Sequence, residues 1–228
     1  MKVMILAAGR GERMRPLTDS LPKPMLSVAG KPLIVHHIEK LRQAGFREFV
    51  INTAWLGDKI VACLKDGRQL GVSIVYSHEG EQALETAGGI CQALPFLDNN
   101  NAPFLVVNGD IYVDYHFNDI PKLAEQIQAH LWLVKNPEHN PLGDFNLEDE
   151  QVSNNGDAAS RYTYSGIGIY RASLFSTCQK GQPAKLAPLL RDAINQQTVS
   201  GSVLPSNWTD VGTPERLALL NKELEGFY

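Results

Sequence analysis

The chain has 228 residues, 43% hydrophobic and 20% charged, which is ordinary for a soluble globular protein and enough to bury a substantial core. Its formal net charge of -4 argues against a surface for nucleic acid or anionic membranes, and no apolar run approaches transmembrane length. The three cysteines are scattered without a C-x-x-C pair, which argues against a disulfide framework or a thiolate metal site. Without a signal-peptide pattern, a cytoplasmic protein is expected.

The first predicted element is a short buried strand, Val3 to Ala7, which breaks into a glycine-rich turn. Gly9 and Gly11 permit positive φ angles there and let backbone N–H groups approach a ligand, and phosphate groups accept such donors well. Three cations follow the turn: Arg13, Arg15 and Lys23. Prolines flank Lys23 on both sides and restrict its backbone. The stretch predicts a polyphosphate site, with an ordinary βα turn and a solvated basic loop as the alternative.

Helices and strands alternate after this stretch. We expect helices over residues 32–44 and through Ile60 to Leu64, and strands over Phe49–Ile51 and Val72–Tyr76. Such alternation is typical of an α/β fold with a largely parallel sheet, in which ligands bind beyond the carboxyl ends of the strands. The residues expected at that edge are Gly9, Asn52, Glu79 and Asp110.

A loop over residues 78–89 follows the third strand. Thr86 is expected to cap a helix that runs through Ile90 and Leu94. Gly88 and Gly89 would permit close approach of a base or a ribose. From this segment alone, a plain loop with a helix cap is an equally good interpretation.

Two aspartates each stand beside a glycine turn. The apolar run Pro103–Val107 ends in Asn108-Gly109-Asp110, and Asp210 lies in the sequence W-T-D-V-G-T-P. Two oxygen ligands suit Mg²⁺, which keeps several waters and takes its other ligands from phosphate. A plain Asn-Gly-Asp turn is the alternative for the first of them.

The second half of the chain has a different character. We expect a helix over Phe117–Ala129 and an alternating strand over Tyr162–Tyr170. The whole region from Phe117 to Tyr170, including the acidic stretch 147–161, is expected to lie over the sheet as a substrate-covering subdomain and not as a separate folding domain. Two amphipathic helices, to which we assign a structural role, are expected over residues 186–195 and 214–225.

These motifs resemble those of the sugar-phosphate nucleotidyltransferases. The N-terminal stretch matches L-A-A-G-x-G-x-R-M-x-P-L-T…P-K-P, Gly109-Asp110 matches a central G-D, and residues 208–214 match W-x-D-V/I-G-T-P. The resemblance implies a Rossmann-like three-layer α/β fold with a mostly parallel central sheet and a small substrate-covering β subdomain. It also implies a single domain over residues 1–228, with a nucleotide half at about 1–110 and a sugar-phosphate half at about 111–228.

The reaction of this family joins a nucleoside triphosphate to a sugar 1-phosphate and releases pyrophosphate. The resemblance implies that Arg13 stabilises charge on the departing pyrophosphate and Lys23 the α-phosphoryl transition state. Asp110 and Asp210 would hold Mg²⁺ as the cofactor. The nucleotide is expected on Ala8, Gly9, Gly11, Glu79, Thr86, Gly88 and Asn108, and the sugar phosphate on Gly143 and Ser165.

The expected base follows from Glu79, which stands where thymidylyltransferase relatives carry a base-pairing glutamine. A carboxylate accepts the N3–H of uracil or thymine but cannot complement the acceptor at N3 of cytosine, so uracil or thymine is favoured over cytosine. Between these two, the resemblance favours UTP. Three short motifs resemble those of the branch of the family that uridylylates N-acetylmuramate 1-phosphate in peptidoglycan recycling. They are the L-E-T-x-G-G loop, the N-x-A-W-L-G element at Asn52 and the G-D-F stretch at Gly143.

One departure from the family concerns the cation for the sugar phosphate. Hexose-1-phosphate relatives carry an E-K-P element whose lysine binds this phosphate, whereas residues 157–161 here read D-A-A-S-R. Either Arg161 substitutes for that lysine, or a residue elsewhere such as Lys185 supplies the charge.

Other functions stay open on the sequence. Mannose-1-phosphate guanylyltransferases and glucose-1-phosphate thymidylyl- and uridylyltransferases share the N-terminal signature, and phosphocholine cytidylyltransferases use the same short form. A non-catalytic sensor that binds a nucleotide sugar is the alternative from another class, although it would not need this set of charged residues: Arg13, Lys23, Asp110 and Asp210. The oligomeric state is left open, with a monomer as one option.

Overall fold

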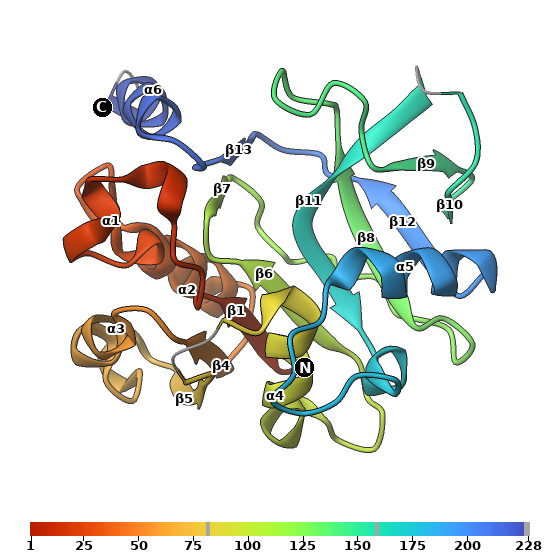
Figure 1. Cartoon of the computed structure of the whole chain (residues 1–228), viewed down its shortest axis with the longest axis horizontal. Coiled ribbons are helices and arrows are strands. Elements are labelled where there is room, and N and C mark those ends of the chain that lie inside the picture. Colours follow the sequence, from red (N-terminus) through yellow and green to blue (C-terminus); the bar gives the residue numbers. More distant parts are fainter. Residues whose placement is uncertain (81–82, 158–159, 226–228) are drawn as a thin grey trace.

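The computed structural model describes residues 1–80, 83–157 and 160–225. A nine-stranded sheet runs through it in the order β5-β4-β1-β6-β11-β8-β12-β10-β9, with helices on both faces (Figure 1). Its strands are β1 (Val3–Leu6), β4 (Glu48–Thr53), β5 (Ser73–His78), β6 (Phe104–Asn108), β8 (Ala129–Val134), β9 (Phe145–Glu148), β10 (Gln151–Ser153), β11 (Arg161–Tyr170) and β12 (Val199–Val203). The α-helices are α1 (Leu17–Ser20), α2 (Leu33–Gln43), α3 (Gly57–Leu64), α4 (Glu85–Leu97), α5 (Leu186–Asn195) and α6 (Pro214–Glu225). Two small ribbons pair β2 (Ser27–Val28) with β3 (Lys31–Pro32), and β7 (Ile111–Val113) with β13 (Trp208–Asp210).

Four neighbouring strands of the sheet, β5, β4, β1 and β6, run parallel to one another. Helices lie in the connections between them, which is the alternation that the sequence predicts. β11 runs antiparallel between β6 and β8, β12 lies parallel to β8, and the β10–β9 hairpin forms the edge. The predicted α/β fold is confirmed, and the stretch expected to cover the sheet extends it at this edge.

Successive residues of β1 face opposite sides of the sheet and enter separate cores. Val3 and Ile5 belong to a core with Ile38 of α2, whereas Met4 belongs to a core with Ile90 of α4. The three β1 side chains are fully buried. Helices cover both faces of the sheet, so the protein has three layers. For the same reason the sequences of the central strands are continuously apolar.

A third core joins the N-terminal region to the C-terminal helix. Its members are Met14, Leu26, Val28, Leu33, Val211, Leu217 and Leu220. Asn221 of α6 reinforces it, accepting a hydrogen bond from the N–H of Ala29 at 2.7 Å and donating one to the carbonyl of Ser27 at 3.3 Å. The β2–β3 ribbon, which follows Lys23 in the chain, therefore rests on α6.

The expected helix over Phe117–Ala129 is wrong, because the described chain is irregular there until β8 begins. Pro121 interrupts the stretch and cannot donate a helical hydrogen bond. The carbonyl groups that a helix would use internally are bound instead by Arg171, which follows β11. Its guanidinium donates to the carbonyl oxygens of Ile127 at 3.0 Å, Leu123 at 3.2 Å and Ala124 at 3.4 Å.

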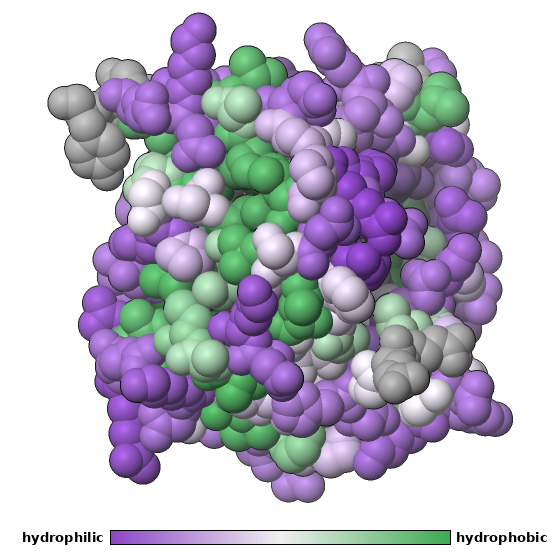
Figure 2. All heavy atoms as spheres, turned by 60° about the vertical axis from the view of Figure 1, so that its left-hand side comes forward, coloured by the Kyte–Doolittle hydropathy of each residue, from purple (hydrophilic) through white to green (hydrophobic). Residues whose placement is uncertain are grey.

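The surface mixes hydrophilic and hydrophobic residues. Figure 2 shows one side of the molecule as mostly hydrophilic, with hydrophobic residues gathered in a band down its middle. The large hydrophobic side chains that the described residues expose belong to separate elements, such as Leu17 of α1, Val75 of β5 and Leu219 of α6. None of the described helices combines the length and the apolar character needed to cross a bilayer.

A buried histidine links β8 to β12 and makes the stability depend on pH. His130 is 5% exposed, and its ring nitrogens lie 2.9 and 3.0 Å from the hydroxyl oxygens of Ser200 and Ser202. Burial lowers the pKa of His130 from 6.5 to about 4, so as the pH falls the unfolded chain takes up this proton first. The stabilising contribution of the neutral ring is full above pH 6.5 and is lost as the pH falls towards 4.

We expect His130 to remove roughly 2 kcal/mol from the unfolding free energy between pH 7 and pH 5. Urea denaturation of the wild type and of His130→Gln at both pH values measures this contribution. Between the two pH values, the unfolding free energy of the wild type should fall by roughly 2 kcal/mol more than that of the variant. Burial also lowers the pKa of His37 to about 4, but this histidine changes the unfolding free energy equally in both proteins. Equal losses in the two proteins would contradict the prediction.

Candidate active site

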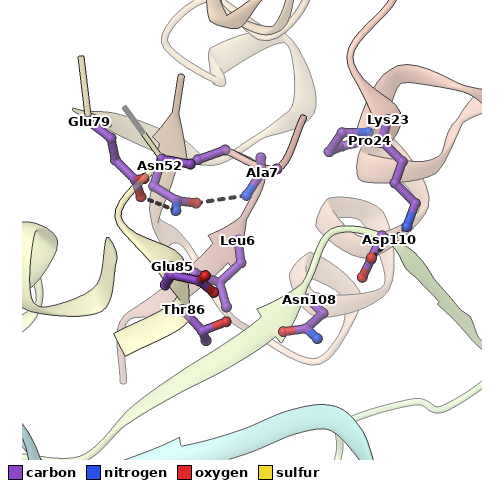
Figure 3. A pocket seen from close by; sticks show the side chains of 13 residues that line it. Leu6, Ala7, Lys23, Pro24, Asn52, Glu79, Glu85, Thr86, Asn108 and Asp110 are labelled. Atoms are coloured by element: carbon purple, nitrogen blue, oxygen red, sulfur yellow. Dashed lines mark hydrogen bonds and ion pairs between the residues drawn. The ribbon is translucent and has the colours of Figure 1, made fainter. Parts of the chain in front are cut away.

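A pocket of about 350 Å³ lies where the four parallel strands end (Figure 3). Each strand contributes a residue within one position of its end: Leu6, Asn52, Glu79 and Asn108. Figure 3 shows Lys23 with Asp110 on one side of the pocket and Asn52 with Glu79 on the other. The glycine turn adds Ala8 and Gly9 to the wall. The structure thus brings together the residues expected at the ligand edge of the sheet.

A chain of hydrogen bonds fixes the side of the pocket formed by β4 and β5. The N–H of Ala7 donates to Asn52 Oδ1 at 2.7 Å, and Asn52 Nδ2 donates to Glu79 Oε1 at 2.6 Å. The N–H of Leu84 donates to Glu79 Oε2 at 2.9 Å. The Glu79 carboxylate is held in place, yet each oxygen keeps a lone pair for a ligand. Sequence reasoning gave Asn52 no role in this network, although a polar residue within a buried strand is a signal for one.

Gly89 of α4 is required by the same network. A Cβ at this position would clash with Glu79 Oε1 and lie 2.9 Å from Asn52 Nδ2. We expect Gly89→Ala to lower the unfolding free energy by about 1 to 2 kcal/mol, because the clash exceeds the gain in helix propensity. Gly9→Ala is the matched control for thermal denaturation, since a Cβ at Gly9 would meet nothing within 4 Å. A wild-type melting temperature for Gly89→Ala would contradict the prediction.

Thr86 lines the pocket, but its expected role as the helix cap is wrong. α4 begins at Glu85, its N-cap residue is Leu84, and no side chain caps it. The N–H of Leu84 is bound by Glu79 from the preceding loop, so the chain enters the helix one residue before Thr86. Thr86 consequently lies in the first turn and forms part of the pocket wall.

Three residues predicted to act at the nucleotide lie outside the wall of this pocket. Gly11, at φ 67°, packs against Thr18, whose hydroxyl donates to the Gly11 carbonyl at 2.8 Å. Gly88 donates its N–H to the carbonyl of Ala184 at 3.0 Å, and the close approach of these segments leaves no room for a Cβ. Arg13 is exposed on the 3-10 helix that follows the glycine turn. The two glycines therefore shape the segments that carry pocket residues.

Lys23 is nearly buried beside the pocket. It begins a short 3-10 helix, Lys23–Met25, and the preceding Pro22 is extended, at φ -66° and ψ 144°. Its Nζ lies 2.6 Å from Asp110 Oδ2, and only 9% of its side chain is exposed, compared with 38% for Asp110. An enclosed lysine between two prolines is a fixed charge at the pocket wall.

β7 and β13 bring the second aspartate next to the first. The two strands pair with Asp210 opposite Ile111, and the N–H of Val211 donates to the carbonyl of Asp110 at 2.9 Å. Asp110, directly before β7, and Asp210, at the end of β13, are therefore on neighbouring backbone segments. Their side chains line different pockets, because Asp210 lies outside the first pocket and lines another one with His139 and Arg216.

Both carboxylates are paired with cationic groups of the chain itself. Asp210 Oδ2 lies 2.7 Å from Arg216 Nη1 of α6 and 3.1 Å from His139 Nε2, as Lys23 lies beside Asp110. Carboxylate oxygens are the ligands that a hard divalent cation prefers, and Asp110 and Asp210 lie on neighbouring backbone segments. In the described part of the chain no three His, Cys, Asp or Glu side chains gather into a metal site, so such an ion would take further ligands from substrate and water. Sequence reasoning missed Arg216, because the pattern of its helix indicates only packing.

A second pocket, of about 330 Å³, adjoins the first and shares Glu85, Thr86 and Asn108 with it. Its remaining wall comes from β9, β11 and the first turns of α5, with the residues just before them: Asp144, Phe145, Tyr164, Lys185, Leu186, Ala187, Leu190 and Arg191. The two pockets are therefore neighbours, with Thr86 and Asn108 at the boundary between them. α5, which its pattern marks only as a packing helix, forms one side of this pocket.

The polar side chains of the second pocket differ in whether they have hydrogen-bond or ion-pair partners. Asp144 accepts hydrogen bonds from the N–H of Tyr164 at 2.8 Å and from Asn140 Nδ2 at 3.3 Å. Burial raises the pKa of Tyr164, so its phenol stays protonated and bonds to Tyr170 at 2.8 Å. Two cations of the wall pair with no acidic side chain of the described residues: Lys185 and Arg191.

Of the two cations expected to replace the missing lysine, Lys185 lines the second pocket and Arg161 lines neither pocket. Arg161 Nη2 instead points to the carbonyl of Asn154, at 3.4 Å. Residues 158 and 159 of the D-A-A-S-R stretch lie outside the described residues.

Gly143 and Ser165 also lie outside the pocket walls. Gly143 has a φ of 61°, and a Cβ there would lie 2.6 Å from Asn136 Oδ1, so only glycine fits directly before Asp144. Ser165 is 1% exposed, and its hydroxyl accepts a hydrogen bond from the N–H of Ile167 at 3.2 Å. Both residues shape the backbone around the second pocket.

Sequence comparison relates the chain to known enzymes. The profile of the Nucleotidyl transferase family matches residues 2–226. The chain is 55% identical over 222 residues to the N-acetylmuramate alpha-1-phosphate uridylyltransferase of Neisseria meningitidis serogroup B, and 95% of each chain is covered. It is 28% identical to the mannose-1-phosphate guanyltransferase beta-A of Xenopus laevis, over 94% of this chain and 62% of that protein.

Solved structures share the fold at low identity. A Bacillus anthracis crystal structure assigned as a glucose-1-phosphate thymidylyltransferase, in complex with sucrose, superposes with a TM-score of 0.83 at 22% identity, covering 98% of this chain and 94% of that one. HddC from Yersinia pseudotuberculosis superposes with a TM-score of 0.78 at 19% identity, covering 98% and 99%. These similarities support the Rossmann-like α/β fold that the motifs imply.

Proposed function

The chain belongs to the nucleotidyl transferase family, and on that premise we propose that it transfers a uridylyl group from UTP to N-acetylmuramate 1-phosphate. The products are UDP-N-acetylmuramate and pyrophosphate. The observation that carries the proposal is the similarity to the Neisseria uridylyltransferase along nearly the whole of both chains. The joined pockets are consistent with it, because one substrate has to reach the other past Thr86 and Asn108.

The first pocket is suited to the nucleotide. The glycine turn at Ala8 and Gly9 would bind the triphosphate through backbone N–H groups, and no atom occupies the space that a Cβ of Gly9 would take. Glu79 would accept the N3–H of uracil with the lone pairs that its protein contacts leave free. Thr86, Asn108 and the glycines behind the wall would complete this half of the site.

The chemistry needs no covalent enzyme intermediate. An oxygen of the sugar phosphate attacks the α-phosphorus of UTP, and the bond from that phosphorus to the oxygen of the leaving pyrophosphate breaks. Lys23 would stabilise charge on the α-phosphoryl group, and Arg13, at the exposed end of the turn, charge on the pyrophosphate. Lys185 would hold the sugar phosphate in line for attack.

A divalent metal fits the same arrangement. Asp110 and Asp210 are the residues that would hold Mg²⁺, since their backbone segments are hydrogen-bonded to each other and their carboxylates supply the oxygen ligands it prefers. When bound, the ion would supply positive charge against the phosphates. Arg216 and His139 would then hold Asp210 in position from its other side.

The nucleotide half would span about 1–110 and the sugar half about 111–228 of a single domain, in a cytoplasmic enzyme of peptidoglycan recycling. Gly143 and Ser165 would act in the sugar half by shaping the backbone near Asp144 and Tyr164.

Pyrophosphate release with Mg²⁺ tests the function directly. UTP, dTTP, CTP and GTP are crossed with four 1-phosphates, those of N-acetylmuramate, N-acetylglucosamine, glucose and mannose. We expect the highest kcat/KM for UTP with N-acetylmuramate 1-phosphate. A preference for GTP with mannose 1-phosphate would overturn both the base and the sugar, and no release with any pair would favour a nucleotide-sugar sensor.

A further inference from the structure

Arg191 lines the second pocket in addition to Lys185, and neither pairs with an acidic side chain of the described residues. A neutral hexose 1-phosphate would bring one anionic group to this pocket and would need one of the two cations. We propose that Arg191 binds a carboxylate carried by the sugar itself and thereby selects acidic sugar phosphates. This inference rests on the proposed function, because it assumes that the sugar occupies the second pocket.

Lys185 is tied to the junction of the two pockets. The preceding residue, Ala184, donates its N–H to the carbonyl of Leu84 at 3.0 Å and accepts one from the N–H of Gly88 at 3.0 Å. Leu84 is followed by Glu85 and Thr86, which belong to both pockets. The sugar phosphate has to meet the α-phosphate of the nucleotide at this junction, so Lys185 is the cation on the phosphate side.

Arg191 lies further along α5. From residue 185 to residue 191 the chain advances six residues, roughly 9 Å along the axis at about 1.5 Å per residue. The backbone carbonyl of Arg191 accepts a hydrogen bond from Asn154 Nδ2 at 3.0 Å, which fixes this turn next to the residue that follows β10. Arg191 therefore meets the part of the sugar remote from its phosphate.

The chemistry of the pocket suits a carboxylate at that place. A guanidinium can donate two parallel hydrogen bonds to one carboxylate, which gives geometric selectivity as well as charge. Asp144 accepts hydrogen bonds from a backbone N–H and from Asn140, and Glu85 lies in the wall shared with the nucleotide pocket. N-acetylmuramate 1-phosphate carries a lactyl carboxylate, whereas N-acetylglucosamine 1-phosphate does not.

The test measures kcat/KM with UTP for N-acetylmuramate 1-phosphate and for its lactyl methyl ester, which removes only this charge. We expect Arg191→Met to lower kcat/KM about 30-fold for the acid and less than about 3-fold for the ester. Lys185→Met should lower both alike. Arg68→Met, at an arginine whose side chain is 89% exposed and lies outside both pockets, is the matched control and should change neither. Inhibition constants replace kcat/KM where turnover of the ester is too slow to measure.

The outcomes separate the inference from the function on which it rests. Suppose that the wild type uses N-acetylmuramate 1-phosphate, and that Arg191→Met lowers kcat/KM equally for the acid and the ester or lowers it for neither. Arg191 then does not bind the carboxylate, and the inference is overturned. If the wild type does not use N-acetylmuramate 1-phosphate at all, the proposed function itself is wrong.

Discussion

Replacing Lys23 by alanine should reduce pyrophosphate release by at least about a thousandfold while the protein stays folded. The lysine is enclosed between prolines and 9% exposed, so no neighbouring side chain can supply the same charge at the same place. Its proposed contribution is to the transition state, where charge grows on the α-phosphoryl group. UTP affinity should therefore change far less than kcat.

Single-turnover rates and UTP titrations of Lys23→Ala measure these two quantities separately. The matched control is Lys31→Ala, because Lys31 also pairs with a carboxylate, Glu39, but lies outside both pockets. The melting temperature of Lys23→Ala should stay close to that of the wild type, since Asp110 is 38% exposed and water can solvate it when its partner is lost. A near-normal rate, or a rate that falls only in proportion to unfolded protein, would refute the proposed role.

The second large effect is expected at the paired aspartates. Asp110→Asn and Asp210→Asn should each lower turnover by at least about a thousandfold and raise the Mg²⁺ concentration needed for half-maximal rate. The double variant should be little worse than either single variant, because residues that act on one ion as a unit are not additive. Asparagine keeps an oxygen to accept the hydrogen bonds of Lys23 or Arg216, so the folds should persist.

Turnover as a function of Mg²⁺ concentration, together with Mg²⁺ binding in calorimetry, tests this prediction. Asp114→Asn is the matched control, because Asp114 follows β7 and pairs with Lys40 but lines neither the pocket of Asp110 nor that of Asp210. Additive losses, or an unchanged requirement for Mg²⁺ in both single variants, would show that the two carboxylates do not share an ion.

The first pocket was predictable because the sequence signals for its residues are local. A buried strand, a glycine turn and Lys23 between prolines lie within the first two dozen residues, and the alternation of strands and helices places Asn52, Glu79 and Asp110 at one edge. The structure brings these residues into one pocket. Their individual roles stay predictions.

The second pocket could not be predicted in the same way, because its wall joins residues far apart in the chain. β11 returns antiparallel beside β6, and α5 then brings Lys185 and Arg191 to a pocket that also contains Asn108. Nothing in the amphipathic pattern of α5 separates a packing helix from one that lines a cavity. The helix predicted over Phe117–Ala129 failed for a similar reason, since its carbonyl groups are bound by Arg171 from another element.

The third core has a consequence for how the enzyme is made. The glycine turn and Lys23 leave the ribosome early, but Met14, Leu26 and Leu33 find their apolar partners on α6 only after residue 220 has been synthesised. At about 5 to 20 residues per second, this apolar surface waits roughly 10 to 40 seconds in the growing chain. Part of the N-terminal apolar surface therefore stays uncovered during that interval, when chaperones can bind it and it can aggregate.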